Sequence, residues 1–143
     1  MQYITTSAEE TIKLGKNLAT KLKGKAAVLA LVGNLGAGKT TFVQGFAEGL
    51  GIKDKILSPT FVLVRQHKIP DTNSTLFHID LYRLENDKDL KSLGLDELWS
   101  QKASLVLIEW AEKIKKLPEN ALYITFENLG GNRRKITTQY SLF

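Results

Sequence analysis

The chain alternates between uninterrupted apolar runs and segments whose apolar residues recur at helical spacing. Residues 26–32 and 105–108 are apolar throughout and lack the polar alternation of a strand that has one face in water. Within 7–24, which begins with a Ser-x-x-Glu capping box, and within 39–51, the apolar residues follow one face of a helix. Strands covered on both faces, combined with amphipathic helices, predict an α/β fold with a parallel sheet flanked by helices.

Shorter β-favouring segments are expected to extend this parallel core. The predicted strands are 3–4, 62–64, 75–80, 121–126 and 135–140. Polar turn residues at 66–74 and at 128–132 separate two pairs of these strands, so each pair is predicted to form an antiparallel hairpin. A further amphipathic segment, 87–99, is interrupted by Gly94 and predicts two short helices.

The segment between the central apolar run and the second helix, residues 33–41 (GNLGAGKTT), carries the clearest chemistry. Gly33, Gly38, Lys39 and Thr40 fill the fixed positions of the phosphate-binding motif G-x-x-x-x-G-K-[ST]. Glycines let backbone N–H groups turn inward around a polyphosphate, and the start of the following helix adds partial positive charge. Lys39 would reach the β- and γ-phosphates, and the Thr40 hydroxyl would bind Mg²⁺. A glycine-rich turn can match the motif by chance, but the strand before it and the helix after it favour a nucleotide site.

Two carboxylates end apolar strands and are candidates to complete that site. Asp80 closes the strand 75–80, where a carboxylate can face a metal or an attacking water. Glu109 ends the second apolar run in the pattern of a Walker B strand, whose terminal acid supports Mg²⁺ at the carboxyl edge of a parallel sheet, with Glu in place of the usual Asp. For both, an ordinary strand end is the alternative. His78 is interpreted as a packed or surface side chain, and Trp110 as a residue of the core or of an interface.

Thr60 follows Pro59 in the sequence SPTF. Because proline disfavours helical conformation in the residue before it, Thr60 is expected on a stiff turn. A threonine in this region of a phosphate-loop protein can sense the γ-phosphate and Mg²⁺, and an ordinary turn is the alternative. The residues alone leave both interpretations open.

Composition narrows the class of protein further. A chain of 143 residues suits a single domain, 1–143. The absence of cysteine excludes disulfides and thiolate metal sites and fits the cytoplasm. No apolar run approaches the roughly 20 residues that cross a bilayer, so a cytoplasmic protein without membrane contact is expected. The net charge of +5 favours polyanionic partners without identifying one.

Four separated motifs, GNLGAGKTT, SPTF, HIDLYRL and LIEWAEK, together resemble the bacterial TsaE family, also known by the names YjeE and YdiB. The resemblance covers nearly the whole chain. It implies a phosphate-loop NTPase fold, with a mostly parallel core extended by antiparallel strands. It also implies binding of ATP and Mg²⁺, slow ATP hydrolysis by the isolated protein, and action in a complex with TsaD and TsaB. That assembly attaches a threonylcarbamoyl group to the adenosine beside the anticodon in tRNAs that read codons starting with A, with TsaD carrying the transfer chemistry.

The resemblance also assigns residues, in a nucleotide-binding set and a catalytic set. The nucleotide-binding set comprises Ala8, Gly33, Leu35, Gly36, Ala37, Gly38, Lys39, Thr40, Thr41 and Arg133. The catalytic set comprises Lys39, Thr60, Asp80 and Glu109, with Thr40 and Glu109 as the Mg²⁺ ligands. Ala8 suits a backbone contact, Asp80 matches the acid of the H-x-D-x-Y-R motif, and Thr60 matches the switch-like threonine. Arg133 is chosen as the arginine near the last hairpin, with Arg134 left open.

The expected function is therefore a Mg²⁺-dependent ATPase in which Asp80 or Glu109 orients the attacking water. One rival is a small-molecule kinase that uses the same loop, although 143 residues leave little room for a lid and an acceptor pocket. The other rival is a nucleotide-gated binding module whose hydrolysis is incidental. Direct tRNA binding is a hypothesis motivated by the net charge of +5, and contact with tRNA is otherwise expected through the complex.

Overall fold

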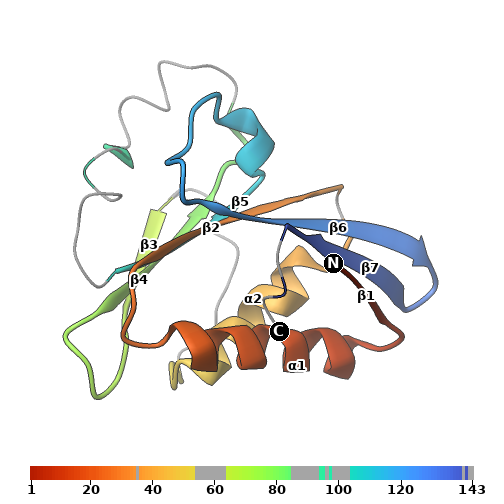
Figure 1. Ribbon diagram of the computed structural model, residues 1–143, viewed down its shortest axis with the longest axis horizontal. Helices are drawn as coiled ribbons and strands as arrows, with labels where there is room; N and C mark the ends of the chain where they lie inside the picture. Colours follow the sequence, from red (N-terminus) through yellow and green to blue (C-terminus); the bar gives the residue numbers. More distant parts are fainter. Residues whose placement is uncertain are drawn as a thin grey trace.

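Parallel strands form the centre of the molecule, and antiparallel strands extend it at both edges (Figure 1). The computed structural model describes residues 1–34, 36–53, 64–84, 94–95, 97, 104–139 and 141. Within these residues, a seven-stranded sheet has the order β1-β7-β6-β2-β5-β4-β3. Its strands are β1 (Gln2–Thr5), β2 (Ala27–Gly33), β3 (Val64–Lys68), β4 (Thr75–Asp80), β5 (Leu105–Glu109), β6 (Leu122–Gly130) and β7 (Arg133–Thr138). The helices are α1 (Ala8–Leu22), α2 (Lys39–Gly49) and the short 3-10 helix η1 (Ala111–Lys113).

Strand directions confirm the predicted combination of a parallel core with antiparallel extensions. The pairs β2–β6, β2–β5 and β4–β5 are parallel. The pairs β3–β4, β6–β7 and β1–β7 are antiparallel. The two predicted hairpins therefore exist: β3–β4 forms one end of the sheet, and β6–β7 lies toward the other end, where β1 is the edge strand. The parallel strands bring their carboxyl ends to one edge, which is where an open α/β sheet usually binds ligands.

Local signals fix the ends of both helices as expected. The Glu10 backbone N–H donates to Ser7 Oγ over 3.2 Å, and Glu10 Oε2 accepts from the Thr6 backbone N–H over 2.6 Å, which completes the cap of α1. Helix α2 starts directly after Gly38 and ends before Gly51, whose φ of +85° is a left-handed conformation that glycine adopts without strain.

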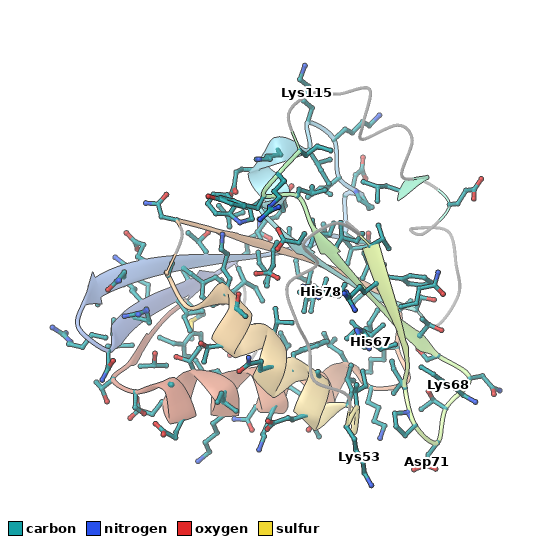
Figure 2. All side chains as sticks on the ribbon, turned by 180° about the vertical axis from the view of Figure 1, so that it is seen from behind. Lys53, His67, Lys68, Asp71, His78 and Lys115 are labelled. Atoms are coloured by element: carbon teal, nitrogen blue, oxygen red, sulfur yellow. The ribbon has the colours of Figure 1, made fainter. Side chains whose placement is uncertain are left out.

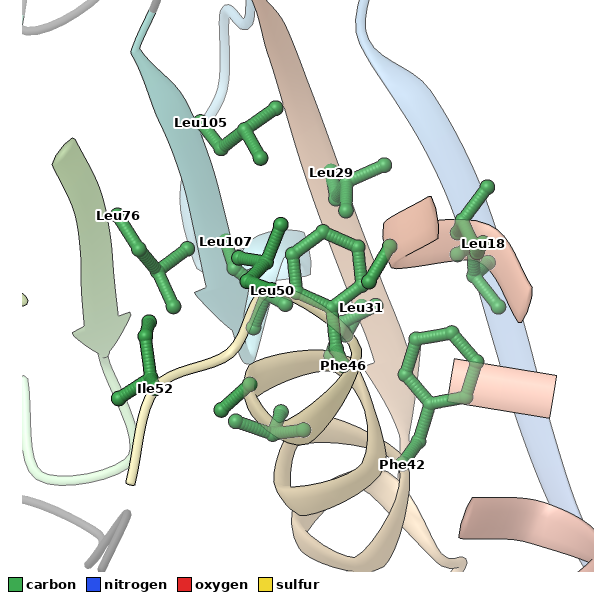
Figure 3. Packing of buried hydrophobic residues seen from close by; sticks show 14 of the residues in the cluster. Leu18, Leu29, Leu31, Phe42, Phe46, Leu50, Ile52, Leu76, Leu105 and Leu107 are labelled. Atoms are coloured by element: carbon green, nitrogen blue, oxygen red, sulfur yellow. The ribbon is translucent and has the colours of Figure 1, made fainter. Parts of the chain in front are cut away.

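Alternating side chains of the central strands fill two apolar layers. Leu29 and Leu31 of β2 face α1 and α2, where Phe42 and Phe46 pack on them (Figure 3). Val28, Ala30 and their neighbours on β4 and β5 pack on the opposite face with η1 residues. Burying each large side chain of this kind stabilises the fold by roughly 1.5–3 kcal/mol. The sheet is therefore covered on both faces, as its uninterrupted apolar runs predict.

Helices α1 and α2 touch through their backbones. They lie side by side on one face of the sheet (Figure 1). A Cβ atom placed on Gly45 would lie 2.1 Å from the Ile12 carbonyl oxygen, and one on Gly15 would lie 2.4 Å from the Phe42 carbonyl oxygen. The contact therefore requires glycine on both helices, and it holds the start of α1 close to the start of α2.

Both hairpins differ from the prediction in their boundaries. Strand β3 continues to Lys68, so the predicted connection at 66–74 is too long, and β6 and β7 continue to Gly130 and from Arg133, so the turn predicted at 128–132 is too long as well. The outer strands expose polar residues to water, and their composition resembles that of a loop. Strand β6 also shifts register at Asn128 and Gly130, which lets a polar, glycine-containing segment stay in the sheet.

Several predicted features lie outside the described residues. They are the Thr60 turn, most of the strand at 62–64, the loop residue Leu35, and the two short helices at 87–99 apart from residues 94, 95 and 97. In the described part of the chain, no helix is both long and apolar enough to cross a membrane.

Candidate functional site

A cavity of about 420 Å³ opens at the carboxyl edge of the parallel strands. It is bounded by the loop after β2, the first turns of α1 and α2, the ends of β4 and β5, and the β6–β7 hairpin. Its lining residues are Ser7, Ala8, Thr11, Gly36, Gly38, Lys39, Thr40, Thr41, Asp80, Tyr82, Glu109, Trp110, Asn132 and Arg134. Residues predicted from four separate stretches of sequence therefore meet in one place.

The phosphate-loop motif forms one wall of this cavity. Gly38 has a φ of +104° and lies directly before α2, so the chain turns sharply and the first N–H groups of the helix lie at the cavity. Gly36, Lys39, Thr40 and Thr41 line the cavity with it.

Two predicted nucleotide-binding residues, Gly33 and Ala37, do not line the cavity but build the loop behind it. The Gly33 carbonyl accepts a hydrogen bond from Lys39, and a Cβ atom on Gly33 would lie 2.5 Å from the Phe126 carbonyl oxygen. Ala37 is buried in the core, and its N–H donates to the Asn34 carbonyl over 3.1 Å. Both residues therefore fix the shape of the loop.

The Lys39 ammonium is held between a carbonyl and an aromatic ring. Its Nζ donates to the Gly33 carbonyl oxygen over 2.5 Å and lies 3.4 Å from the centre of the Trp110 ring. Burial lowers the pKa of Lys39, while the charges of Glu112, Glu109 and Asp80 act in the opposite direction. A buried ammonium beside helix N–H groups is suited to meet an anion entering the cavity.

Asp80 and Glu109 are direct neighbours across the parallel pair β4–β5. Only 8% of Asp80 and 2% of Glu109 are exposed. Burial raises the pKa of Asp80, as does the charge of Glu109, whereas the Tyr82 backbone N–H, 3.0 Å from Asp80 Oδ1, lowers it. The strand ends thus present two carboxylates to the cavity from adjacent positions.

The Glu109 carboxylate is engaged at both oxygens. Oε1 accepts from the Thr40 hydroxyl over 3.4 Å, and Oε2 lies 2.6 Å from His78 Nε2. Thr40 and Glu109 therefore lie in contact on one wall of the cavity, on the same side of the sheet, as the sequence predicts.

This pair of oxygen ligands fits a magnesium ion. Two adjacent ligands of octahedral Mg²⁺ are roughly 3 Å apart, close to the separation of these two side-chain oxygens. Within the described residues, no three or more His, Cys, Asp or Glu side chains are grouped to hold a metal by themselves. Such a cage is not needed, because Mg²⁺ usually binds through one or two protein ligands together with waters and substrate phosphates.

The arginine at the cavity is Arg134, while Arg133, the choice from the sequence, is exposed and does not line it. Successive residues of a strand point to opposite faces, so only one of the pair can turn toward the loop. The Arg134 side chain passes close to Gly38: its Cγ would lie 3.5 Å from a Cβ atom placed there. Its guanidinium donates to Asn128 Oδ1 and to the Gly131 carbonyl on the hairpin.

Several cavity residues were not predicted from the sequence. Trp110 does pack on another aromatic side chain, with its ring centre 5.1 Å from that of Tyr82, but it also lines the cavity and contacts Lys39. His78 is packed as expected, yet it also contacts Glu109. The signal for His78 is its position two residues before Asp80 on one strand, which places both side chains on one face. Ser7, which lies in the helix start that the family resemblance singles out, also lines the cavity, as do Thr11 and Asn132, which no sequence motif marks.

Comparisons with known proteins agree on one family. The family model described as "Threonylcarbamoyl adenosine biosynthesis protein TsaE" matches residues 5–136. The tRNA threonylcarbamoyladenosine biosynthesis protein TsaE of Bacillus subtilis (strain 168) is 41% identical over 138 residues, covering 96% of this chain and 84% of that protein. The protein of the same name from Treponema pallidum (strain Nichols) is 36% identical over 138 residues, covering 96% and 98%.

The fold agrees as well. The crystal structure of Bacillus subtilis YdiB matches with a TM-score of 0.78 and 37% sequence identity, covering 96% of this chain and 83% of that one. Both the sequence relatives and this structure span nearly the full chain. The resemblance found in the four motifs is thereby confirmed, and the chain belongs to the TsaE family of threonylcarbamoyl adenosine biosynthesis proteins.

Proposed function

We propose that the protein binds ATP with Mg²⁺ and hydrolyses the ATP in support of threonylcarbamoyladenosine formation in tRNA. The observation that carries this proposal is the meeting of Lys39, Thr40, Asp80 and Glu109 in one cavity at the start of α2. These side chains come from one helix and two strands, and together they supply a cation, a hydroxyl and two carboxylates. That set matches the needs of phosphoryl transfer to water.

The loop and Lys39 are assigned to the phosphates. The N–H groups at the start of α2 and the Lys39 ammonium would neutralise the charge of the triphosphate and the charge that develops on the transferring phosphoryl group. Thr40 and Glu109 would hold Mg²⁺, which when bound supplies a positive charge that bridges the phosphate oxygens. At the other walls of the cavity, the Ala8 backbone and the Arg134 side chain are proposed to contact the nucleotide. Thr60, the switch-like threonine of the sequence prediction, stays a prediction.

Asp80 is the better candidate to orient the attacking water. Both oxygens of Glu109 already have partners, Thr40 and His78. Asp80 also lines the cavity, and the hydrogen bond described for its carboxylate is the one that Oδ1 accepts from the Tyr82 N–H. A carboxyl with a raised pKa is also the stronger base once it is ionised.

The proposed protein partners are those that the family resemblance implies. We propose that the protein acts in the cytoplasm together with TsaD and TsaB, and that tRNA contacts are made through that complex. The net charge of +5 is compatible with a polyanion nearby.

Phosphate release from ATP tests the assignment. Lys39→Ala is expected to lose ATP hydrolysis, whereas Lys13→Ala, which removes an exposed lysine from α1, is expected to keep it. Hydrolysis at the wild-type rate in Lys39→Ala would overturn the site.

A second experiment separates an ATPase from a nucleotide-gated binding module. In a reconstitution with TsaB, TsaD and tRNA, a variant that binds ATP but does not hydrolyse it should fail to support repeated rounds of modification. Many rounds with such a variant would favour the binding module.

A further inference from the structure

His78 has a buried polar contact that the proposed reaction does not use directly. Its Nε2 lies 2.6 Å from Glu109 Oε2, and the side chains are 1% and 3% exposed. The other histidine of the chain, His67, lies on the neighbouring edge strand β3 and not at the cavity (Figure 2). Burying a polar ring costs free energy unless the ring is hydrogen-bonded, so the contact with Glu109 compensates the burial of His78.

The strand register explains how the contact forms. On the parallel pair β4–β5, His78 stands beside Leu107 and Asp80 stands beside Glu109. Because alternate residues share a face, His78, Asp80 and Glu109 lie on the same side of the sheet as Leu107. Glu109 reaches back along this face to the ring, and Leu107, the strand neighbour of His78, belongs to the apolar core on that face. The imidazole is therefore held rigidly while its Nε2 faces the carboxylate.

The direction of the hydrogen bond follows from the chemistry of the two groups. An ionised carboxylate can only accept, so the Nε2–H of the imidazole donates. The other ring nitrogen, Nδ1, is buried without a hydrogen-bond partner in the described part of the chain. The tautomer protonated at Nε2 donates its single N–H to Glu109. The other tautomer would leave an N–H buried at Nδ1 without an acceptor, which costs more free energy.

We propose that His78 is a positioning residue that fixes the rotation of the Glu109 carboxylate, so that Oε1 faces Thr40 and the pair is ready to bind Mg²⁺. The proposal rests on the metal-dependent nucleotide binding proposed above. The terminal torsion of a glutamate is soft, so the carboxylate needs an external group to hold its plane. Lys39 is a competing partner, because its charge is close enough to interact with that of Glu109. By holding Oε2, His78 keeps the carboxylate directed to the metal position.

Three variants of His78 separate positioning from packing. His78→Leu removes the donor at similar volume, and His78→Gln places an amide N–H near the position of Nε2. His78→Asn also keeps an amide N–H, but its side chain is too short to reach Glu109. His67→Gln is the matched control, because it changes the only other histidine, which does not line the cavity.

The main measurement is the affinity for Mn²⁺ in the presence of ADP, determined by titration calorimetry and by the EPR signal of free Mn²⁺. We expect His78→Leu and His78→Asn to weaken Mn²⁺ binding about tenfold or more, the usual effect of losing a group that orients a metal ligand. His78→Gln should stay within about threefold of wild type, and His67→Gln should be unchanged. ADP affinity without metal should be unchanged in all four variants. If His78→Leu does not fold, the comparison of His78→Asn with His78→Gln gives the same decision.

Equal Mn²⁺ affinity in the wild type and in the donor-free variant would overturn the positioning role, and so would an equal loss of ADP affinity with and without metal. Wild-type protein that shows no metal-dependent ADP binding would instead overturn the proposed function, and the role of His78 with it. Ring ¹⁵N signals, assigned with His67→Gln, provide an independent readout. His78 should be protonated at Nε2 and bare at Nδ1, and the opposite tautomer would contradict the hydrogen bond on which the proposal is built.

Discussion

Thr40 donates to Glu109 over 3.4 Å, although the two residues are 69 positions apart in the chain. The contact joins the first turn of α2 to the end of β5 and closes one side of the cavity. The sequence motifs GNLGAGKTT and LIEWAEK predict that their threonine and glutamate meet at one site, and this contact joins them.

Glu109→Gln is expected to keep nucleotide binding but lose hydrolysis. The amide has the shape of the carboxylate, but only one of its two terminal atoms is an oxygen, so it can accept from Thr40 or from His78 and not from both. It also lacks the charge that a metal ligand needs. Removing such a group typically lowers kcat by roughly 10²–10³-fold. Steady-state phosphate release and ADP titration measure the two effects, with Glu119→Gln as the control because Glu119 is exposed and does not line the cavity. Wild-type kcat in Glu109→Gln would contradict the assignment.

Arg134→Ala is expected to weaken nucleotide binding, and Arg133→Ala is not. A charge-assisted hydrogen bond to a phosphate contributes roughly 1.5–3 kcal/mol, which corresponds to about tenfold or more in affinity. The two variants change the same residue type at adjacent positions, and only Arg134 lies at the cavity. Titration of both variants with a fluorescent nucleotide measures the two affinities and decides which arginine contacts the nucleotide. A larger loss in Arg133→Ala would restore the choice made from the sequence.

Asp80→Asn is expected to stabilise the folded protein at neutral pH while it slows hydrolysis. Burial raises the pKa of Asp80 in the folded protein above its ordinary value of 3.8, so ionising this carboxyl costs the folded state free energy as the pH rises through the raised pKa. Asparagine stays neutral, and its Oδ1 can still accept from the Tyr82 N–H. The gain in unfolding free energy should therefore be present at neutral pH and disappear as the pH falls below 3.8.

Urea unfolding at several pH values tests this stability difference, and kcat should fall by about 10²-fold or more if Asp80 orients the water. If wild type and Asp80→Asn differed in unfolding free energy by the same amount at every pH, ionisation of Asp80 would not destabilise the folded protein. Unchanged kcat would transfer the water-orienting role to Glu109.

Gly45→Ala is expected to destabilise the fold. The new methyl group would lie 2.1 Å from the Ile12 carbonyl oxygen, so the two helices must separate. Overpacking costs about 1–3 kcal/mol, and a contact this short with a backbone atom belongs at the upper end, above the gain in helix propensity of about 1 kcal/mol. Asn17→Ala, at an exposed position of α1, is the control, and thermal unfolding is the measurement. An equal or higher melting temperature in Gly45→Ala would show that the helix contact is loose.

Fold class and the strand directions follow from local sequence signals, whereas strand boundaries and the side-chain contacts between neighbouring strands do not. The apolar run before Gly33 and the glycine spacing after it identify the central strand and the loop because both act through nearest neighbours. The predicted hairpins failed in their boundaries, since the polar residues of an edge strand such as β3 cannot be distinguished from a loop by composition. Fold class and family were both predicted correctly.

The site was predictable where a motif marks a residue and incomplete where only geometry does. Lys39, Thr40, Asp80 and Glu109 were all chosen from the sequence, and the structure brings them to one cavity. The choice between Arg133 and Arg134 depends on which face of β7 each residue takes, and that is set by the register with β6. The contact of His78 with Glu109 depends on two strands that are adjacent only in space.

The glycine contact between α1 and α2 limits which walls of the cavity can move. Since the backbones of these helices touch at Gly15 and Gly45, the two walls of the cavity that they form must move as one rigid unit. Under the proposed function, any motion of the cavity walls that accompanies exchange of ADP for ATP is therefore expected on the opposite side, at the β6–β7 hairpin that carries Arg134 or at the aromatic pair Tyr82 and Trp110. A partner that accelerates this exchange would be expected to bind at the hairpin or at the aromatic pair, and it would not need to contact α1 or α2.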